Sequence, residues 1–130
     1  MQSQPELRER GLSLLDQLHG SGSAQALIAD MAGLCPDFVD MTIEWALGGV
    51  ESRPGLDLIT RELVMIASCV TLGHAVTQLR AHVHVALTIG ASREQVIEAI
   101  LQLIFYAGGA SVRNALVSCR DLLAVPVENS

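Results

Sequence analysis

The stretch QLRAHVHVAL, Gln78–Leu87, decides whether the centre of the chain is a strand or a helix. His82 and His84 stand two residues apart in it, among alanine, valine and leucine. The segment from Val76 is of helical length and stops at Gly90, and convincing strands and hairpin turns are absent from the sequence. We therefore predict a helix over about residues 76–89.

The two histidines of this predicted helix point in different directions. At about 100° per residue, the apolar side chains cover a little more than half of the circumference. His82 falls inside that arc and His84 falls outside it, near Arg80 and Thr77. Because two residues turn a helix by roughly 200°, the two rings point about 160° apart and cannot chelate one metal ion. We expect no metal site and interpret His84 as a surface or interface residue.

The same kind of punctuation divides the rest of the chain into helices. Asp57 is a good N-cap, and Ser92 with Gln95 forms a capping box. We expect an all-α single domain over residues 1–130, with a frayed tail at 125–130. The other predicted helices are Pro5–His19, Ala24–Ala32, Pro36 to Gly48-Gly49, a helix from Asp57 to Leu72, Ser92–Ala107 and Ser111–Ala124.

Composition narrows the class of protein. The chain has 130 residues, about one domain, with 50% hydrophobic and only 3% aromatic residues. Its formal net charge of −6 argues against nucleic-acid binding, which needs a basic face. No apolar run reaches the roughly 18–20 residues of a membrane span, and no signal-peptide segment is evident, so we expect a cytoplasmic protein. So much aliphatic surface in a small helical domain predicts a homo-oligomer.

The three cysteines are too far apart for a recognisable framework. Cys35, Cys69 and Cys119 are odd in number and match neither a disulfide scaffold nor a zinc site. We interpret them as reduced thiols in the interior.

Two ionisable residues lie on apolar helix faces. Glu62 lies between Leu58 and Cys69 on one side and Ile66 on the other, where a carboxylate costs several kcal/mol unless it is paired or protonated.

One explanation of Glu62 is a buried salt bridge to an arginine such as Arg113, and one explanation of His82 is a core histidine bonded to a backbone carbonyl. The alternative is that Glu62 and His82 face each other across a helix pair and carry out proton transfer.

Three further residues are candidates for binding a substrate. Arg53, in the loop SRPGL, could hold a carboxylate, or could be a solvated loop residue. Gln78 lies one turn before His82 and is either a pocket hydrogen-bonder or exposed. Tyr106 lies at the edge of its helix's apolar face, where core packing is the alternative.

The segments SRPGLD, TREL, QLRAHVHVAL, GASREQVIEAILQ and YAGGASVRNAL occur in this order over residues 50–117. In order and spacing they resemble the carboxymuconolactone decarboxylase family. The resemblance implies an AhpD-like fold of about six to seven helices with a core antiparallel helical hairpin, assembled as a trimer or hexamer. The AhpD-type peroxidase branch has a CxxC motif at places occupied here by Ala75 and Gln78. Both thiols are missing, so a thiol peroxidase is disfavoured.

The decarboxylase branch, by resemblance, removes CO2 from an unsaturated lactone carboxylate without metal or organic cofactor. The resemblance makes His82 the proton donor, with Glu62 as its orienting partner or a second proton carrier. Arg53 would bind the carboxylate, helped by Gln78, and Tyr106 would contribute to the pocket. Glu51 stands where the family usually has an aromatic residue, and its charge would repel a dicarboxylate. Isomerisation, cyclisation and a non-catalytic oligomer are therefore alternatives.

Overall fold

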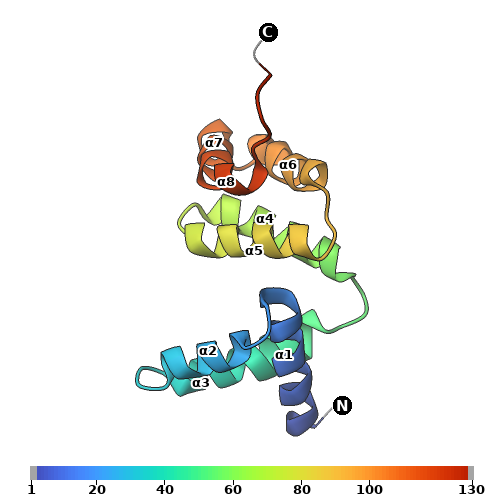
Figure 1. Cartoon of the computed structure of the whole chain (residues 1–130), viewed down its shortest axis with the longest axis vertical. Coiled ribbons are helices and arrows are strands. Elements are labelled where there is room, and N and C mark those ends of the chain that lie inside the picture. Colours follow the sequence, from blue (N-terminus) through green and yellow to red (C-terminus); the bar gives the residue numbers. More distant parts are fainter. Residues whose placement is uncertain (1–2, 129–130) are drawn as a thin grey trace. The chain divides into compact units, whose positions relative to one another are not determined.

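A computed structural model describes residues 3–128, and all of the regular structure in this range is helical. The all-α class predicted from the sequence is confirmed. The described chain forms two compact units, Met1–Leu56 and Asp57–Ser130, and each is described by itself below (Figure 1). The expectation of a single domain over residues 1–130 stays a prediction. No helix of the described residues is long and apolar enough to cross a membrane.

The first unit is a cluster of four helical segments. Ser3 caps the first of them, accepting from the Glu6 amide while the Glu6 carboxylate accepts from the Ser3 amide. Its segments are α1 (Gln4–His19), α2 (Ser23–Met31), α3 (Pro36–Asp40) and η1, a π-helix (Met41–Glu51).

Helix α1 crosses η1 at very short range. A Cβ atom on Gly11 would lie 1.8 Å from the carbonyl oxygen of Ile43, and one on Gly48 would lie 2.0 Å from that of Leu7. The two glycines therefore let the two backbones touch, which any larger side chain would prevent. Arg8 adds ion pairs at 3.0 Å to Asp40 and 3.4 Å to Glu44.

The π-helix differs from the single helix predicted from Pro36 to Gly48-Gly49. The α-helical part ends at Asp40, and the wider π-helical turn continues to Glu51. Four residues of this π-helix are buried, spaced four, one and three positions apart. They are Ile43, Leu47, Gly48 and Glu51.

The second unit is built on a helical hairpin of α4 (Leu58–Leu72) and α5 (Val76–Thr88). Asp57 caps α4 by accepting from the Thr60 amide at 2.8 Å. Gly73 ends α4 with a φ of +82°, the left-handed conformation that glycine adopts without strain. The hairpin and both helix boundaries agree with the prediction to within one residue.

Two more helices pack on this hairpin and close the core. Helix α6 (Arg93–Leu101) begins at the predicted capping box of Ser92 and Gln95 and continues as a short 3₁₀ turn, η2 (Gln102–Phe105). Helix α7 (Gly109–Ser118) follows. The core they share with α4 and α5 is aliphatic, in keeping with the 3% of aromatic residues in the chain. It contains Ile66, Val70, Leu79, Val83, Val96, Ile100 and Val112.

The predicted last helix is divided in two. The backbone leaves helical geometry at Cys119, with φ −107° and ψ 16°, and resumes as α8 (Arg120–Leu123). Arg80 holds this break: it pairs with Asp121 at 2.7 and 2.9 Å and donates to the Ser118 carbonyl at 2.5 Å. This division brings the α-helices within residues 3–128 to eight, against the six to seven expected.

The end of the described chain is non-helical. Val125 and Val127 are exposed, and the frayed tail expected for residues 125–130 stays a prediction. Asn129 and Ser130 lie outside the described residues.

Candidate active site

Helices α4 and α5 bring Glu62 and His82 together inside the second unit. Nδ1 of His82 lies 2.6 Å from Oε2 of Glu62, although the residues are 20 positions apart in sequence. Hairpin geometry explains the contact, because the short turn after Gly73 returns α5 along α4. The predicted meeting of the two residues across a helix pair is therefore present. Arg113, considered above as an alternative partner of Glu62, is exposed.

The two partners differ in exposure. The Glu62 side chain is 1% exposed, whereas that of His82 is 24% exposed. A buried carboxylate of this kind is costly unless a partner compensates it. The 2.6 Å contact is made by Nδ1, and the other ring nitrogen, Nε2, lies on the far side of the imidazole.

Glu62 keeps one oxygen outside this contact. Within residues 3–128, Oε1 of Glu62 is buried and has no hydrogen-bond partner. Buried polar atoms are normally paired, and an unpaired one calls for an explanation such as a catalytic role or a bound water. The arrangement therefore makes Glu62 and His82 candidates for acid/base chemistry.

The thiols near the site are not activated. Burial raises the pKa of Cys69, and the negative charge of Glu62 raises it further. Burial also raises the pKa of Cys119. All three cysteines are unbridged, and Cys35 is exposed, contrary to the interior thiol expected from the sequence. Because a peroxidatic cysteine must react as a thiolate, these environments oppose thiol-peroxidase chemistry.

The three predicted substrate-binding residues are all exposed. Gln78 is exposed on α5, one turn before His82. Tyr106 is fully exposed after η2, so the alternative of core packing within this chain is wrong for it. Arg53 is exposed and belongs to the first unit, whereas the pair belongs to the second. Substrate binding by these three residues stays a prediction.

His84 is exposed, as the helical projection predicted. Among residues 3–128, no group of three or more His, Cys, Asp or Glu side chains is arranged to hold a metal ion.

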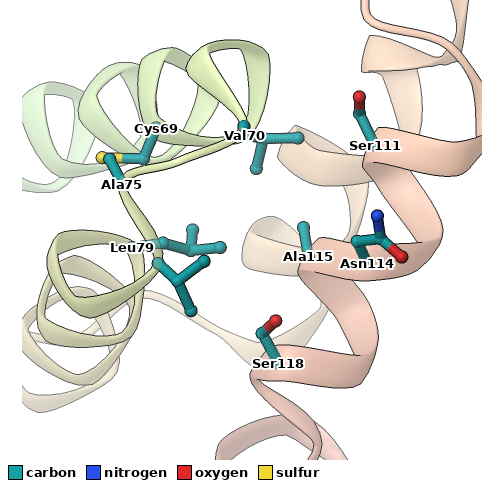
Figure 2. A pocket seen from close by; sticks show the side chains of 10 residues that line it. Cys69, Val70, Ala75, Leu79, Ser111, Asn114, Ala115 and Ser118 are labelled. Carbon is teal, nitrogen blue, oxygen red and sulfur yellow. The ribbon is translucent and has the colours of Figure 1, made fainter.

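A small cavity near the hairpin turn was not predicted. It has a volume of about 60 Å³ and lies between the α4–α5 hairpin and α7 (Figure 2). Three polar residues of α7 line it, at spacings of three and four, a periodicity visible in the sequence. They are Ser111, Asn114 and Ser118.

The amino-acid sequence is similar to those of known proteins. Residues 36–117 match the sequence model of the Carboxymuconolactone decarboxylase family. The chain is 31% identical over 100 residues to a 4-carboxymuconolactone decarboxylase of Acinetobacter baylyi (strain ATCC 33305 / BD413 / ADP1), covering 77% of this chain and 74% of that protein. It is 32% identical over 95 residues to an uncharacterized 15.0 kDa protein in the nqo9-nqo10 intergenic region of Paracoccus denitrificans, covering 72% and 71%.

Proposed function

Since the chain belongs to the carboxymuconolactone decarboxylase family, we propose that it is a cofactor-independent carbon–carbon lyase acting on an unsaturated lactone acid or a related carboxylic acid. The observation that carries the proposal is the 2.6 Å contact between His82 and the buried Glu62. It supplies a positioned imidazole in a site that is partly closed to water, which is what protonation of a carbon requires.

The reaction needs only electron flow into the substrate and one proton. The bond between the carboxylate carbon and the ring breaks, and its electron pair enters the conjugated system as CO2 leaves. The resulting dienolate takes a proton at carbon from His82, and solvent later restores that proton. The ring carbonyl of the substrate accepts the electron pair, so the proposed step requires no metal or organic cofactor.

The exposures of the two side chains divide their roles. A proton donor must lie within hydrogen-bond reach of the reacting atom, and His82 is partly exposed while Glu62 is not. We assign His82 as the proton donor through Nε2. Glu62 is a positioning residue that orients the ring and stabilises the imidazolium form. Arg53 as carboxylate ligand, with Gln78 and Tyr106 as further contacts, completes the proposal.

A homo-oligomer, such as a trimer or hexamer, is part of the proposal. Leu63–Leu72 of α4 contains no charged residue, yet Val64 is 54% and Leu72 is 61% exposed. A helix without charged side chains on any face is ordinarily covered on every side. We propose that a second copy covers this face of α4. Val64→Glu should reduce the molecular mass measured by light scattering, and an unchanged mass would count against this face.

A cytoplasmic location also remains part of the proposal, supported by three unbridged cysteines.

The decisive experiment is a screen of unsaturated lactone acids for CO2 release. Turnover of at least one compound, lost on His82→Ala, is the expected result. Isomerisation or cyclisation without release of CO2 would replace the lyase assignment but keep the acid/base pair. No turnover of any kind, with the oligomer intact, would favour a non-catalytic helical assembly.

A further inference from the structure

The cavity beside the hairpin turn is polar on one side and apolar on the other. Ser111, Asn114 and Ser118 come from α7, and Figure 2 shows them across from Val70 and Leu79 of the hairpin. None of the residues that line it carries a charge. Its 60 Å³ would hold about four waters at roughly 15 Å³ each, which is also the scale of a small organic ring.

The polar side chains of this wall have no hydrogen-bond partner within the described residues, whereas several hydroxyl groups in other helices do. Ser68, for example, bonds the Val64 carbonyl one turn earlier, at 3.1 Å. Thr42, Thr71 and Thr88 do the same at 2.8–2.9 Å.

In the part of the chain that the structure describes, the α7 side chains that line the cavity make no such bond. They are Ser111, Asn114 and Ser118.

Hydroxyl and amide groups that share one wall and have no protein partner are available to a ligand, and a few such polar groups in an otherwise apolar pocket are typical of small-molecule sites. They can donate to a carbonyl oxygen or accept from a hydroxyl group. The absence of a cation in the lining makes the site unsuitable for a carboxylate. Val76 and Leu79 present apolar surface to the carbon atoms of a ring.

The cavity is adjacent to the catalytic pair along both helices of the hairpin. Leu79, in its wall, precedes His82 by three residues, which is about 4.5 Å along the axis of α5. Cys69, also in its wall, is close enough to Glu62 for the carboxylate's charge to act on the thiol. That thiol stays protonated and adds no charge to the lining.

We propose that this cavity is a specificity subsite that binds the uncharged, oxygen-bearing ring of the substrate through Ser111, Asn114 and Ser118. The identity of the ligand as a lactone acid rests on the proposed function. The inference adds that the ring and the carboxylate of this substrate bind in different places. The ring carbonyl enters the neutral cavity, while the carboxylate that is lost stays outside it. The subsite therefore selects for neutral oxygen atoms at one end of the substrate.

The first test needs no turnover. γ-Butyrolactone, a neutral lactone ring, is titrated into the full-length protein and followed by ¹H–¹⁵N NMR, with butyrate as a charged control of similar size. Saturable shifts at the α7 wall are expected with the lactone and not with butyrate. Absence of lactone shifts there, or equal shifts with butyrate, would overturn the subsite, whatever the enzyme's activity.

Variants link the cavity to the substrate. Ser118→Ala should weaken lactone binding and raise KM by about three- to tenfold, the worth of one hydrogen bond, with kcat little changed. Ser68→Ala is the matched control, because that hydroxyl is satisfied within its own helix. Ala115→Leu, which fills the cavity, should abolish lactone binding. If Ala115→Leu disturbs the fold, Ser118→Ala and Asn114→Ala still decide the question.

The two proposals fail in different ways. If Ser118→Ala weakens lactone binding but leaves KM unchanged, the cavity serves a separate small molecule and the subsite inference is wrong. If no lactone acid is turned over, the proposed function fails, but lactone titration of the wild-type protein still tests the cavity. Loss of lactone binding in both Ser118→Ala and Ser68→Ala would also contradict the inference.

Discussion

His82 and His84 lie two residues apart on one helix, yet the first is held by a buried carboxylate and the second is exposed. The pair therefore provides its own matched control. His82→Ala should lower kcat by about 10²- to 10⁴-fold, the usual contribution of a general acid, and His84→Ala should leave it within about twofold. Steady-state CO2 release measures both. Equal losses in the two variants would mean that the helix, not the proton donor, had been damaged.

Replacing Glu62 in the His82→Ala variant should restore stability without restoring activity. His82→Ala leaves Glu62 buried without its partner, which should cost about 3–5 kcal/mol of the free energy of unfolding. The double variant His82→Ala/Glu62→Gln should recover most of that loss, because no uncompensated charge remains, while staying inactive. Urea unfolding measures the difference. A double variant no more stable than His82→Ala would show that the buried charge is not the cause.

Glu62→Gln alone tests the positioning role. Glutamine keeps the size of the side chain but not its charge, so kcat should fall by about 10²-fold with KM little changed. Glu62→Asp keeps the charge and should retain more activity than Glu62→Gln at the same pH. If the two variants are equally impaired, the length of the side chain matters and its charge does not.

The helix crossing in the first unit should tolerate no side chain. Gly48→Ala forces a Cβ against the Leu7 carbonyl, and overpacking of this kind costs on the order of 1–3 kcal/mol. Gly49→Ala is the neighbouring control, since its Cβ would meet the nearest atom at 3.4 Å. Denaturant unfolding should show a lower midpoint only for Gly48→Ala. Equal midpoints would mean that the helices can separate at no cost.

Acid should weaken the ion pair between Arg80 and Asp121 of α8. The hydrogen bond from Arg80 lowers the pKa of Asp121 from its ordinary value of 3.8 to about 2. Because the folded-state pKa is the lower one, the stabilisation is complete above about pH 4 and is lost as the pH falls towards 2. Asp121→Asn should therefore melt earlier than the wild type at pH 5, and the gap should close near pH 2. A gap that is independent of pH would contradict the ion pair's role.

The features that could be predicted from the sequence depend on residues close together in the chain. Asp57 caps the start of α4 with its side chain, and Gly73 ends the helix with a left-handed backbone conformation. The predicted bounds of α4 therefore agree with the observed ones to within one residue. Glu62 and His82 were recognisable because an ionisable group within an apolar stripe needs a partner. Periodicity therefore singled out both residues but left Arg113 and a backbone carbonyl open as their partners, which the hairpin geometry decided.

What could not be predicted depends on contacts between distant segments. The π-helix of the first unit packs at short range against α1. Its conformation therefore depends on contacts with another helix, which the residues of Met41–Glu51 by themselves do not reveal. The break at Cys119 depends on Arg80, 39 positions earlier. The cavity exists only once α7 faces the hairpin, and Tyr106 became exposed because its predicted helix ended early in a 3₁₀ turn.

The environments of the three thiols make the native chain convenient for site-selective chemistry. Cys35 is exposed in the first unit, whereas Cys119 is buried and Cys69 is partly covered, and both have a raised pKa. A maleimide reagent at neutral pH would therefore attach a fluorophore or spin label to Cys35 first, with no engineered substitution. Such a label would report on the first unit while leaving the histidine–carboxylate pair of the second untouched.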